Sequence, residues 1–372
     1  MLVRIKETPV ADMTLVTPAA PAVAADPDPL SSAPHLRAAH RVFRGSLYFT
    51  IGLTLVWLFF VITQRSGGWL FDGYNLNKET LARIVGSFVV YWVLWGLIWY
   101  GIRRALLRYV AGFSKEELAV VFSSRMNQPF ELSPFLARHS ERTIRIIDMV
   151  GRRGRYITIG LGMFLLVHNS IAGNPTPKTF VTALQSGLVE SIFAAWLVLA
   201  AYYSDGFLGK VVLGAQSRLM DGSLARANAV LIIMLWHAFR FIMVPLGIAL
   251  TKIFPVRTYA AVFAFIWLSY QVADALSEII GSLLGKQKLR VWGLGDVNRK
   301  SVAGTWACFL GSLALCLWIV WLHGLSWHWL VLAVIISISN TAFELFSPRG
   351  TDDFTMATAN ALLCWGFGAV VF

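Results

Sequence analysis

The stretch that decides the fold class runs from Tyr259 to Leu283 and reads YAAVFAFIWLSYQVADALSEIIGSL. Its only charged residues are Asp274 and Glu278, both in its second half. About 20 consecutive, mostly apolar residues are enough for a helix to cross the hydrocarbon core of a bilayer. The stretch therefore predicts a membrane-spanning helix that carries two carboxylates toward one end.

Eight other stretches approach the same length and character: Leu47–Thr63, Ile84–Ile102, Tyr156–Ala172, Val181–Tyr203, Ala229–Thr251, Val302–Leu322, Trp329–Leu345 and Thr355–Phe372. Hydrophobic residues make up 57% of the 372 residues and charged residues only 14%, with a mean hydropathy of +0.63. A soluble protein of this size needs more charge to cover its surface. We therefore predict an all-α fold, a polytopic membrane helix bundle of about nine transmembrane helices over residues 47–372.

Basic residues are distributed unevenly between the two sides that these spans define. The segments on the side of the N-terminus hold 25 of the 32 Lys and Arg residues, the other side holds six, and Arg240 lies within the fifth span. Cytoplasmic loops of membrane proteins are enriched in Lys and Arg. We therefore predict a cytoplasmic N-terminus and an outside C-terminus, in the cytoplasmic (inner) membrane of a bacterium. Topology then accounts for the net charge of +12, and we expect no nucleic-acid partner.

Residues 1–46 are rich in Ala and Pro and contain no apolar core of a signal peptide. Such a composition predicts a disordered cytosolic tail. Cys308, Cys316 and Cys364 lie inside apolar stretches without the spacing of metal ligands. They therefore predict neither a disulfide framework nor a zinc site.

The segment 103–155 is too polar to span the membrane and is predicted to be cytosolic. Within it, Ser114 is followed three residues later by Glu117, which is typical of a helix capping box. Arg138, Arg142 and Arg145 recur at helical spacing among isoleucines. This pattern favours an amphipathic helix against anionic headgroups. The alternative is a basic loop that only enforces topology.

Asp274 and Glu278 are four residues apart and therefore project from one helical face. Gly281 and Gly285 continue this face, and we expect their lack of side chains to let a bulky anion approach the backbone. A basic segment follows, with the cations Lys286, Lys288, Arg290, Arg299 and Lys300. Carboxylates could hold Mg²⁺, which prefers oxygen ligands, and the cations could neutralise phosphate. Alternatively, the carboxylates pair structurally and the loop only sets topology.

A second acidic group is predicted on the same side of the membrane, where Glu344 closes the eighth span and Asp352 and Asp353 precede the ninth. These carboxylates could join Asp274 and Glu278 around one cavity, although Asp352 and Asp353 could also simply cap a helix. Charges within spans are costly and mark function or structural pairs. Glu190 and Arg240 are accordingly predicted to form a structural ion pair.

Two blocks of this region resemble the membrane-bound CTP-dependent lipid-alcohol kinases (dolichol and phytol kinases), a family related to the CTP:phosphatidate cytidylyltransferases. The first block runs Asp274-Ala275-Leu276-Ser277-Glu278-Ile279-Ile280-Gly281-Ser282, Gly285-Lys286, Asn298-Arg299-Lys300-Ser301, Gly304-Thr305 and Phe309-Leu310-Gly311-Ser312. The second runs from Glu344 through Ser347-Pro348-Arg349-Gly350-Thr351 to Asp352. The resemblance covers the motif region 271–357, under a quarter of the chain.

The resemblance implies a CTP-dependent kinase that phosphorylates a long-chain isoprenoid alcohol, such as a polyprenol, dolichol or phytol, at the cytosolic face. It implies Mg²⁺ and CTP as cofactors, a membrane lipid as substrate, and a chain that could form a homodimer. Asp274, Glu278 and Asp352 would then be catalytic, and Asp274, Glu278, Glu344 and Asp352 would hold the metal. The residues expected to bind nucleotide are Gly281, Gly285, Lys286, Lys288, Arg299, Lys300, Ser301, Gly304 and Arg349.

The sequence also departs from this family. Members usually carry Gly at Ala273, Glu at Ala303, Asn at Asp353 and Pro at Ala357, and an early Arg-Lys-x-x-His element is not recognisable here. Three alternatives therefore stay open. They are a phosphatidate cytidylyltransferase that releases pyrophosphate, a transporter whose carboxylates line a path across the bilayer, and a non-catalytic homologue that scaffolds partners.

Overall fold

The computed structural model describes residues 33–62, 82, 85–87, 89–122, 132–202, 204, 206–214, 216–291, 298–347 and 350–372. The described chain is almost entirely helical, with one two-stranded antiparallel sheet. In chain order the elements are α1 (Ala33–Ile62), η2 (Val89–Leu94), α3 (Trp95–Tyr109), α4 (Lys115–Phe122), α5 (Ser133–Leu136), α6 (Glu141–Gly173), α7 (Pro177–Tyr202), α8 (Phe207–Leu213), η3 (Leu219–Leu224), α9 (Ala225–Ile253), η4 (Val256–Thr258), α10 (Tyr259–Leu283), β1 (Lys288–Val291), β2 (Asn298–Ser301), α11 (Val302–Leu322), α12 (Trp327–Phe346) and α13 (Asp352–Val371).

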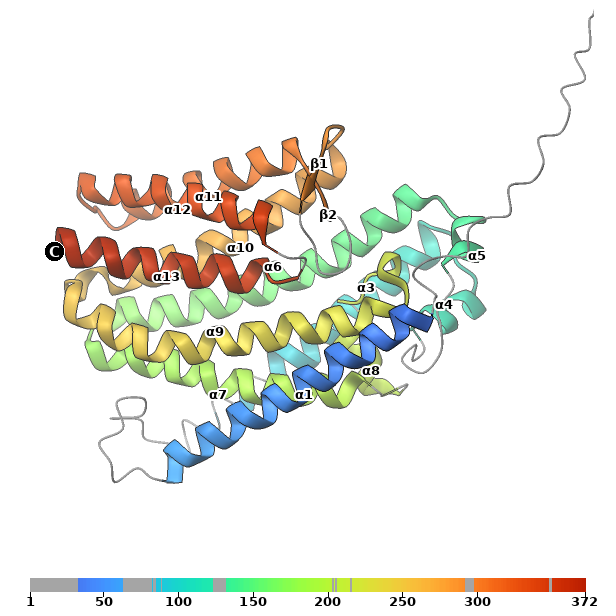
Figure 1. The fold of residues 1–372 in the computed structure, drawn as a ribbon, viewed down its shortest axis with the longest axis horizontal. Helices are drawn as coiled ribbons and strands as arrows, with labels where there is room; N and C mark the ends of the chain where they lie inside the picture. Colours follow the sequence, from blue (N-terminus) through green and yellow to red (C-terminus); the bar gives the residue numbers. More distant parts are fainter. Residues whose placement is uncertain are drawn as a thin grey trace, which may run out of the picture.

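Nine helices in the described part of the chain are long and apolar enough to cross a membrane, which confirms the predicted number. Their spans are His40–Phe59, Val85–Tyr109, Glu141–Gly173, Pro177–Tyr202, Ala225–Ile253, Val256–Leu283, Val302–Leu322, Trp327–Phe346 and Asp352–Val371. The long helices run side by side along the longest axis of the molecule (Figure 1). Such a bundle is compatible with an integral membrane protein.

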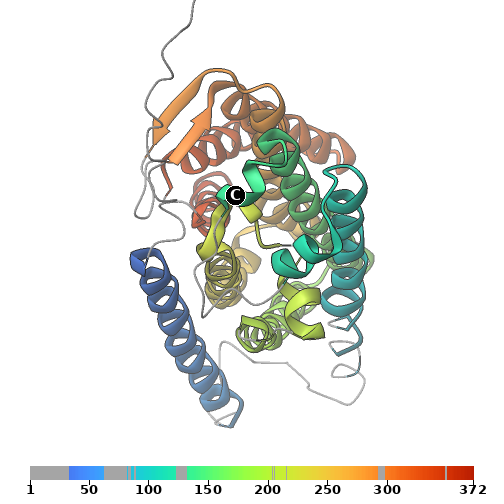
Figure 2. The same cartoon turned by 90° about the vertical axis from the view of Figure 1, so that its right-hand side faces the viewer.

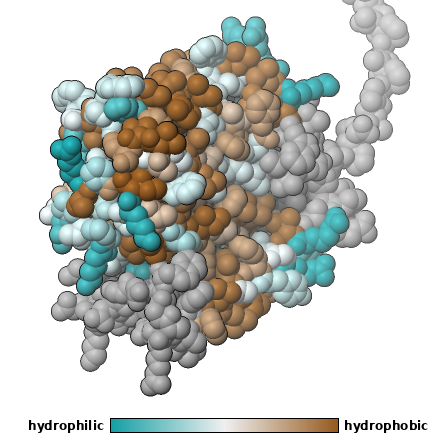
Figure 3. All heavy atoms as spheres, turned by 60° about the vertical axis from the view of Figure 1, so that its left-hand side comes forward, coloured by the Kyte–Doolittle hydropathy of each residue, from teal (hydrophilic) through white to brown (hydrophobic). Residues whose placement is uncertain are grey.

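Large apolar side chains remain exposed on the outer helices. Examples are Leu55 on α1, Trp306 and Trp321 on α11, and Leu362 on α13. Apolar side chains cover much of the face shown in Figure 3, with polar ones toward its edges. Exposed apolar surface of this extent is costly in water and is what lipid-facing helices present.

Helix α10 is the centre of the bundle. All residues from Tyr259 to Gln271 are buried, and α10 packs against α6, α11, α12 and α13, as the end view in Figure 2 shows. A helix that is apolar on every side is typical of a protein core or of a membrane span. Its charged residues, Asp274 and Glu278, both lie in its second half.

A buried polar cluster ties α10, α11, α12 and α13 together. The amide nitrogen of Asn340 donates to Ser312 Oγ at 2.8 Å, and that of Asn360 donates to Asn340 Oδ1 at 2.9 Å and to Ser269 Oγ at 3.1 Å. All four side chains are fully buried. Hydrogen bonds of this kind fix the mutual positions of apolar helices in a membrane.

Glu190 and Arg240 form no direct salt bridge among the described residues, but their charges are near enough to interact. The Arg240 guanidinium lies over two indole rings, with Cζ at 3.7 Å from the Trp267 centroid and 4.7 Å from that of Trp236. Aromatic faces attract a desolvated guanidinium strongly. The two indole rings therefore make the direct contacts that were predicted for the carboxylate.

The structure differs from two predictions about where helices lie. Helix α1 begins at Ala33, so residues 33–46 are helical rather than part of a disordered tail, while residues 1–32 lie outside the described residues. Arg142 and Arg145 lie in the first turns of α6, whereas Arg138 precedes that helix. The three arginines therefore do not share one surface helix, because α6 continues directly into the third span.

The segment before α6 has a small core of its own, which includes Leu107, Phe113 and Phe135. The predicted capping box is present: Ser114 N donates to Glu117 Oε2 at 2.7 Å and Glu117 N donates to Ser114 Oγ at 3.1 Å. Glu117 also faces His139 Nε2 at 3.2 Å and Arg138 Nη2 at 3.1 Å. Burial raises the pKa of Glu117, but these hydrogen bonds and charges outweigh it, so the pKa lies below its ordinary value.

Candidate functional site

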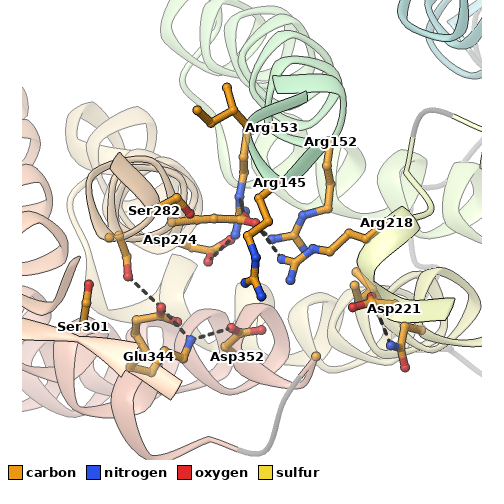
Figure 4. A pocket seen from close by; sticks show the side chains of 18 of the residues that line it. Arg145, Arg152, Arg153, Arg218, Asp221, Asp274, Ser282, Ser301, Glu344 and Asp352 are labelled. Carbon is orange, nitrogen blue, oxygen red and sulfur yellow. Dashed lines mark hydrogen bonds and ion pairs between the residues drawn. The ribbon is translucent and has the colours of Figure 1, made fainter. Parts of the chain in front are cut away.

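A polar cavity of about 710 Å³ opens at the end of the bundle where α6, α10, α12, α13 and the β1–β2 hairpin meet. Its lining includes carboxylates and cations from distant parts of the chain (Figure 4): Asp221, Asp274, Glu278, Glu344, Asp352, Asp353, Arg142, Arg145, Arg152, Arg153, Arg218, Lys288 and Lys300. The predicted meeting of the two acidic groups around one cavity is confirmed.

One side of the cavity gathers the carboxylates of Asp274, Glu344 and Asp352. One oxygen from each lies within 4.8 Å of the others. Lys300 Nζ donates to Glu344 Oε1 at 2.6 Å and to Asp352 Oδ2 at 3.4 Å. Ser277 Oγ also donates to Glu344 Oε1, at 2.7 Å. The three acids therefore come from three helices, and Lys300 joins two of them, Glu344 and Asp352.

The donor set suits a divalent cation. Glu344 is 4% exposed, and its Oε2 has no hydrogen-bond partner among the described residues. A buried carboxylate oxygen without a partner is costly. Mg²⁺ is commonly bound by one or two carboxylates together with phosphate oxygens. Asp274, Glu344 and Asp352 could hold such an ion, with the free oxygen of Glu344 as one ligand.

Glu278 has a different environment from the one predicted. It accepts from Arg218 Nη2 at 2.7 Å and also forms ion pairs with Arg152 and Arg153. Arg153 in turn donates from Nη2 to Asp274 Oδ1 at 2.8 Å. Glu278 lies outside the carboxylate group that could hold a metal, because only Asp274, Glu344 and Asp352 place oxygens within 4.8 Å of one another among the described residues. Its role in this arrangement is to hold the arginines in place.

The basic segment after α10 folds into a hairpin that the sequence analysis did not predict. β1 and β2 pair antiparallel, with Leu289 opposite Lys300 and Lys288 opposite Ser301. Lys288, Lys300 and Ser301 line the cavity, whereas Lys286 is not among its lining residues. The side chain of Arg299, the glycine-rich stretch Gly293-Leu294-Gly295 and Arg349 lie outside the described residues.

Lys300 is held in a charged state by its neighbours. Burial alone would lower its pKa, but the Glu344 and Asp352 carboxylates outweigh this effect and raise the pKa above the ordinary lysine value. The ammonium group therefore stays protonated across the neutral range. A fixed positive charge beside three carboxylates is available to meet an incoming phosphate.

The glycines predicted to admit an anion also lie in tight packing. A Cβ on Gly304 would lie 2.7 Å from Ser277 O and 3.2 Å from Gly281 Cα. A Cβ on Gly281 would lie 2.8 Å from Ser301 Oγ, and Gly285 is equally tight against Ser301. These glycines let α10 and α11 cross closely. Only Gly281 of the three also lines the cavity.

The sequence analysis missed the arginine side of the site. Arg152, Arg153 and Arg218 were counted only toward topology. Tyr156, whose hydroxyl donates to Asp353 Oδ1 at 2.9 Å, was treated as the start of a span. An adjacent arginine pair one turn before a span was the available signal, since such charges are costly at a membrane edge.

A narrow groove of about 100 Å³ adjoins the cavity and is mostly apolar. Its lining includes Trp92, Ile159, Ala229, Ile232, Ile233 and Trp236. Arg152, Arg153, Arg218 and Asp353 line both spaces. The arrangement can therefore place a polar headgroup among the charges while apolar atoms stay between the spans.

Comparison with known proteins identifies no relative: no protein-family model matches the chain, and neither curated proteins nor solved structures match it. The site's function is accordingly argued from its own chemistry. The arrangement combines three elements: a carboxylate group suited to a divalent cation, cations suited to phosphate, and an apolar groove beside them.

Proposed function

We propose that this chain is a membrane-embedded CTP-dependent kinase that phosphorylates a long-chain isoprenoid alcohol. The observation that carries the proposal is the grouping of Asp274, Glu344 and Asp352, two of which contact Lys300, in a cavity that also opens to an apolar groove. A phosphotransferase acting on a lipid needs these parts together, because its donor is a polyanion and its acceptor is apolar.

In the proposed reaction the alcohol oxygen forms a bond to the γ-phosphorus of CTP. The bond between that phosphorus and the β,γ-bridging oxygen breaks, which releases CDP and leaves a lipid monophosphate. Lys288 and Lys300 contact the phosphates and neutralise their charge. Asp353, which lines both the cavity and the groove, accepts the alcohol proton.

Asp274, Glu344 and Asp352 are the residues that would hold Mg²⁺. When bound there, Mg²⁺ supplies positive charge that neutralises the transferred phosphoryl group. The sequence-based assignments of Lys286, Arg299 and Arg349 to phosphate binding remain predictions. We no longer propose Glu278 as a metal ligand, because it is not part of the carboxylate group of Asp274, Glu344 and Asp352.

The cavity is proposed to face the cytosol of a bacterial cytoplasmic membrane. The support is the 25-to-6 distribution of Lys and Arg residues, because the cavity lies on the same side as the cation-rich segments. The transporter alternative loses support, because it requires carboxylates along a path through the bilayer, whereas those of the cavity lie at one end of the bundle.

The test uses purified full-length protein, Mg²⁺ and CTP labelled at either the α- or the γ-phosphate, with a panel of isoprenoid alcohols and with phosphatidate. A kinase places the γ-label in the lipid and releases CDP. A cytidylyltransferase places the α-label in the lipid and releases pyrophosphate. Absence of label in every lipid, from protein that remains folded, would contradict both enzymatic readings.

A further inference from the structure

Arg152 and Arg218 stand where the polar cavity meets the apolar groove, and they line both. Arg152 comes from α6, and Arg218 immediately precedes η3. Figure 4 shows both side chains pointing toward the open space between α6 and the carboxylate helices. The junction is therefore the point where a bound molecule would pass from charged to apolar surroundings.

These two arginines retain donors that the protein does not use. Each contributes only Nη2 to Glu278, and the buried Nε of Arg152 has no partner among the described residues. Arg153, by contrast, commits Nε, Nη1 and Nη2 to Asp274 and Glu278. A guanidinium carries five N–H donors. Arg152 and Arg218 can therefore bind a further anion without losing Glu278.

Asp353, a carboxylate that lines both spaces, does not compete for these donors. It accepts from the Tyr156 hydroxyl at 2.9 Å, and the ion pairs of Arg152 and Arg218 among the described residues are with Glu278. Guanidinium groups match the oxygens of a phosphate in pairs. The groove beside them has room for only the first carbons of a chain and is lined by apolar side chains such as Ile233 and Trp236. An inorganic anion would leave that groove unfilled.

We propose that Arg152 and Arg218 bind the phosphate of a lipid phosphate monoester, whose hydrocarbon chain enters the apolar groove and continues among the membrane lipids. The assignment rests on the proposed function in one respect, since a lipid monophosphate is the product of the proposed transfer. It adds a division of the cavity: the arginine side serves the lipid phosphate, and Lys288 and Lys300 serve the nucleotide.

The test measures binding of labelled decyl phosphate to the full-length protein in phosphatidylcholine nanodiscs, with empty nanodiscs to subtract partitioning. Decanol, inorganic phosphate and CTP serve as competitors. We expect decyl phosphate to bind at least tenfold more tightly than decanol or inorganic phosphate. Arg218→Gln should raise the Kd for decyl phosphate roughly tenfold to a hundredfold, because a charge-assisted contact is lost. The Kd for CTP should stay within about twofold of wild type.

Arg145→Gln is the matched control. Arg145 lines the polar cavity but not the groove, and it is paired with Glu141. The Arg145→Gln substitution should therefore leave the Kd for decyl phosphate unchanged. Arg218→Gln should fold, since Glu278 keeps Arg152 and Arg153. If it does not fold, Ile232→Trp narrows the junction without removing charge and should weaken decyl phosphate binding to the level of inorganic phosphate.

Three results would overturn the proposal. The first is that decanol or inorganic phosphate competes as well as decyl phosphate, and the second is that Arg218→Gln and Ile232→Trp both leave the Kd for decyl phosphate unchanged. The third is that Arg218→Gln weakens CTP binding as much as it weakens decyl phosphate binding. The measurement contains no turnover step. Binding that depends on Arg218 without any CTP turnover would therefore refute the kinase proposal alone. CTP turnover together with decyl phosphate binding that Arg218→Gln leaves unchanged would refute only the assignment of Arg152 and Arg218 to the lipid phosphate.

Discussion

Lys300 Nζ lies 2.6 Å from Glu344 Oε1, and this contact joins the β1–β2 hairpin to the end of α12. The two residues are 44 positions apart in the chain. One lysine thus organises carboxylates that hydropathy alone places on separate helices. An experiment can test whether the site needs only the positive charge of Lys300 or also its position.

Lys300→Met combined with Gln287→Lys keeps the charge of the hairpin but moves it to an exposed position. If Lys300 contacts the transferring phosphate, turnover should fall on the order of 100-fold, equivalent to a few kcal/mol of transition-state stabilisation. Turnover is measured with labelled CTP, and Gln287→Lys alone serves as control. A purely topological role for the lysine predicts wild-type turnover in the double variant.

The buried pair Arg103–Asp148 should be the most sensitive ion pair outside the cavity. Its atoms lie 2.6 Å apart, and Asp148 Oδ2 also accepts from Met220 N at 3.2 Å. Asp148→Ala leaves a buried guanidinium unpaired, so we expect a loss of about 3–5 kcal/mol in the free energy of unfolding. Denaturant unfolding in detergent measures it.

The matched control is Glu141→Ala, which removes one partner of the exposed Glu141–Arg145 pair. Exposed pairs contribute little, so its free energy of unfolding should stay close to that of the wild type. Equal effects of Asp148→Ala and Glu141→Ala would show that the Arg103–Asp148 pair does not hold α3, α6 and η3 together.

Gly304→Ala should destabilise the α10–α11 crossing, because the new methyl group would lie 2.7 Å from Ser277 O, a backbone atom that cannot easily move. Overpacking of this kind typically costs about 1–3 kcal/mol. Gly101→Ala is the control, because nothing lies within 4 Å of its Cβ position. A thermal melt in detergent that is equally affected by both substitutions would contradict the close crossing.

Glu117 should make the stability of the segment before α6 pH-dependent. Its pKa is lower in the folded protein than its ordinary value of 4.5. A depressed carboxyl pKa contributes stability above the unfolded value, and that stability is lost as the pH falls through the folded value. Glu117→Gln should therefore lower the Tm at pH 7, and the difference should shrink below about pH 4.5. A difference independent of pH would exclude the charge as its cause.

The topology can be tested by a reporter fused after Phe372. The cation distribution predicts a signal outside the cytosol, because nine spans separate a cytoplasmic N-terminus from the C-terminus. A second reporter at the tip of the β1–β2 hairpin should register in the cytosol. A cytosolic signal from the C-terminal fusion would mean that at least one helix does not span.

The nine helices could be predicted from the sequence because length and hydropathy are local properties. The site was only partly predictable, since its contacts are long-range. Asp274, Glu344 and Asp352 could be placed on one side by topology, but Arg153 meets Asp274 from 121 positions away. Glu278 was predicted to bind a metal for the same reason, since its arginine partners are also far from it in the sequence. Only the packing of α6 against α10 shows that arginines surround it.

Glycine spacing was also ambiguous. Gly281 and Gly285 are four residues apart, a spacing that fits both an anion site and a close helix crossing, although α10 itself ends at Leu283. Their packing partners, Ser301 and Gly304, could not be identified from spacing alone. The hairpin was missed because its strands are four residues each and carry four cations between them, without the apolar alternation that usually identifies a strand.

The central claim is that the carboxylate group around Lys300 supports phosphoryl transfer from CTP to a lipid alcohol. The most direct measurement compares γ-label incorporation into an isoprenoid alcohol by the wild-type protein, Asp274→Asn and the exposed control Glu116→Gln, in the presence of Mg²⁺. We predict incorporation by wild type and Glu116→Gln, and its abolition in Asp274→Asn at near-normal expression. Full incorporation by a folded Asp274→Asn protein would contradict the account.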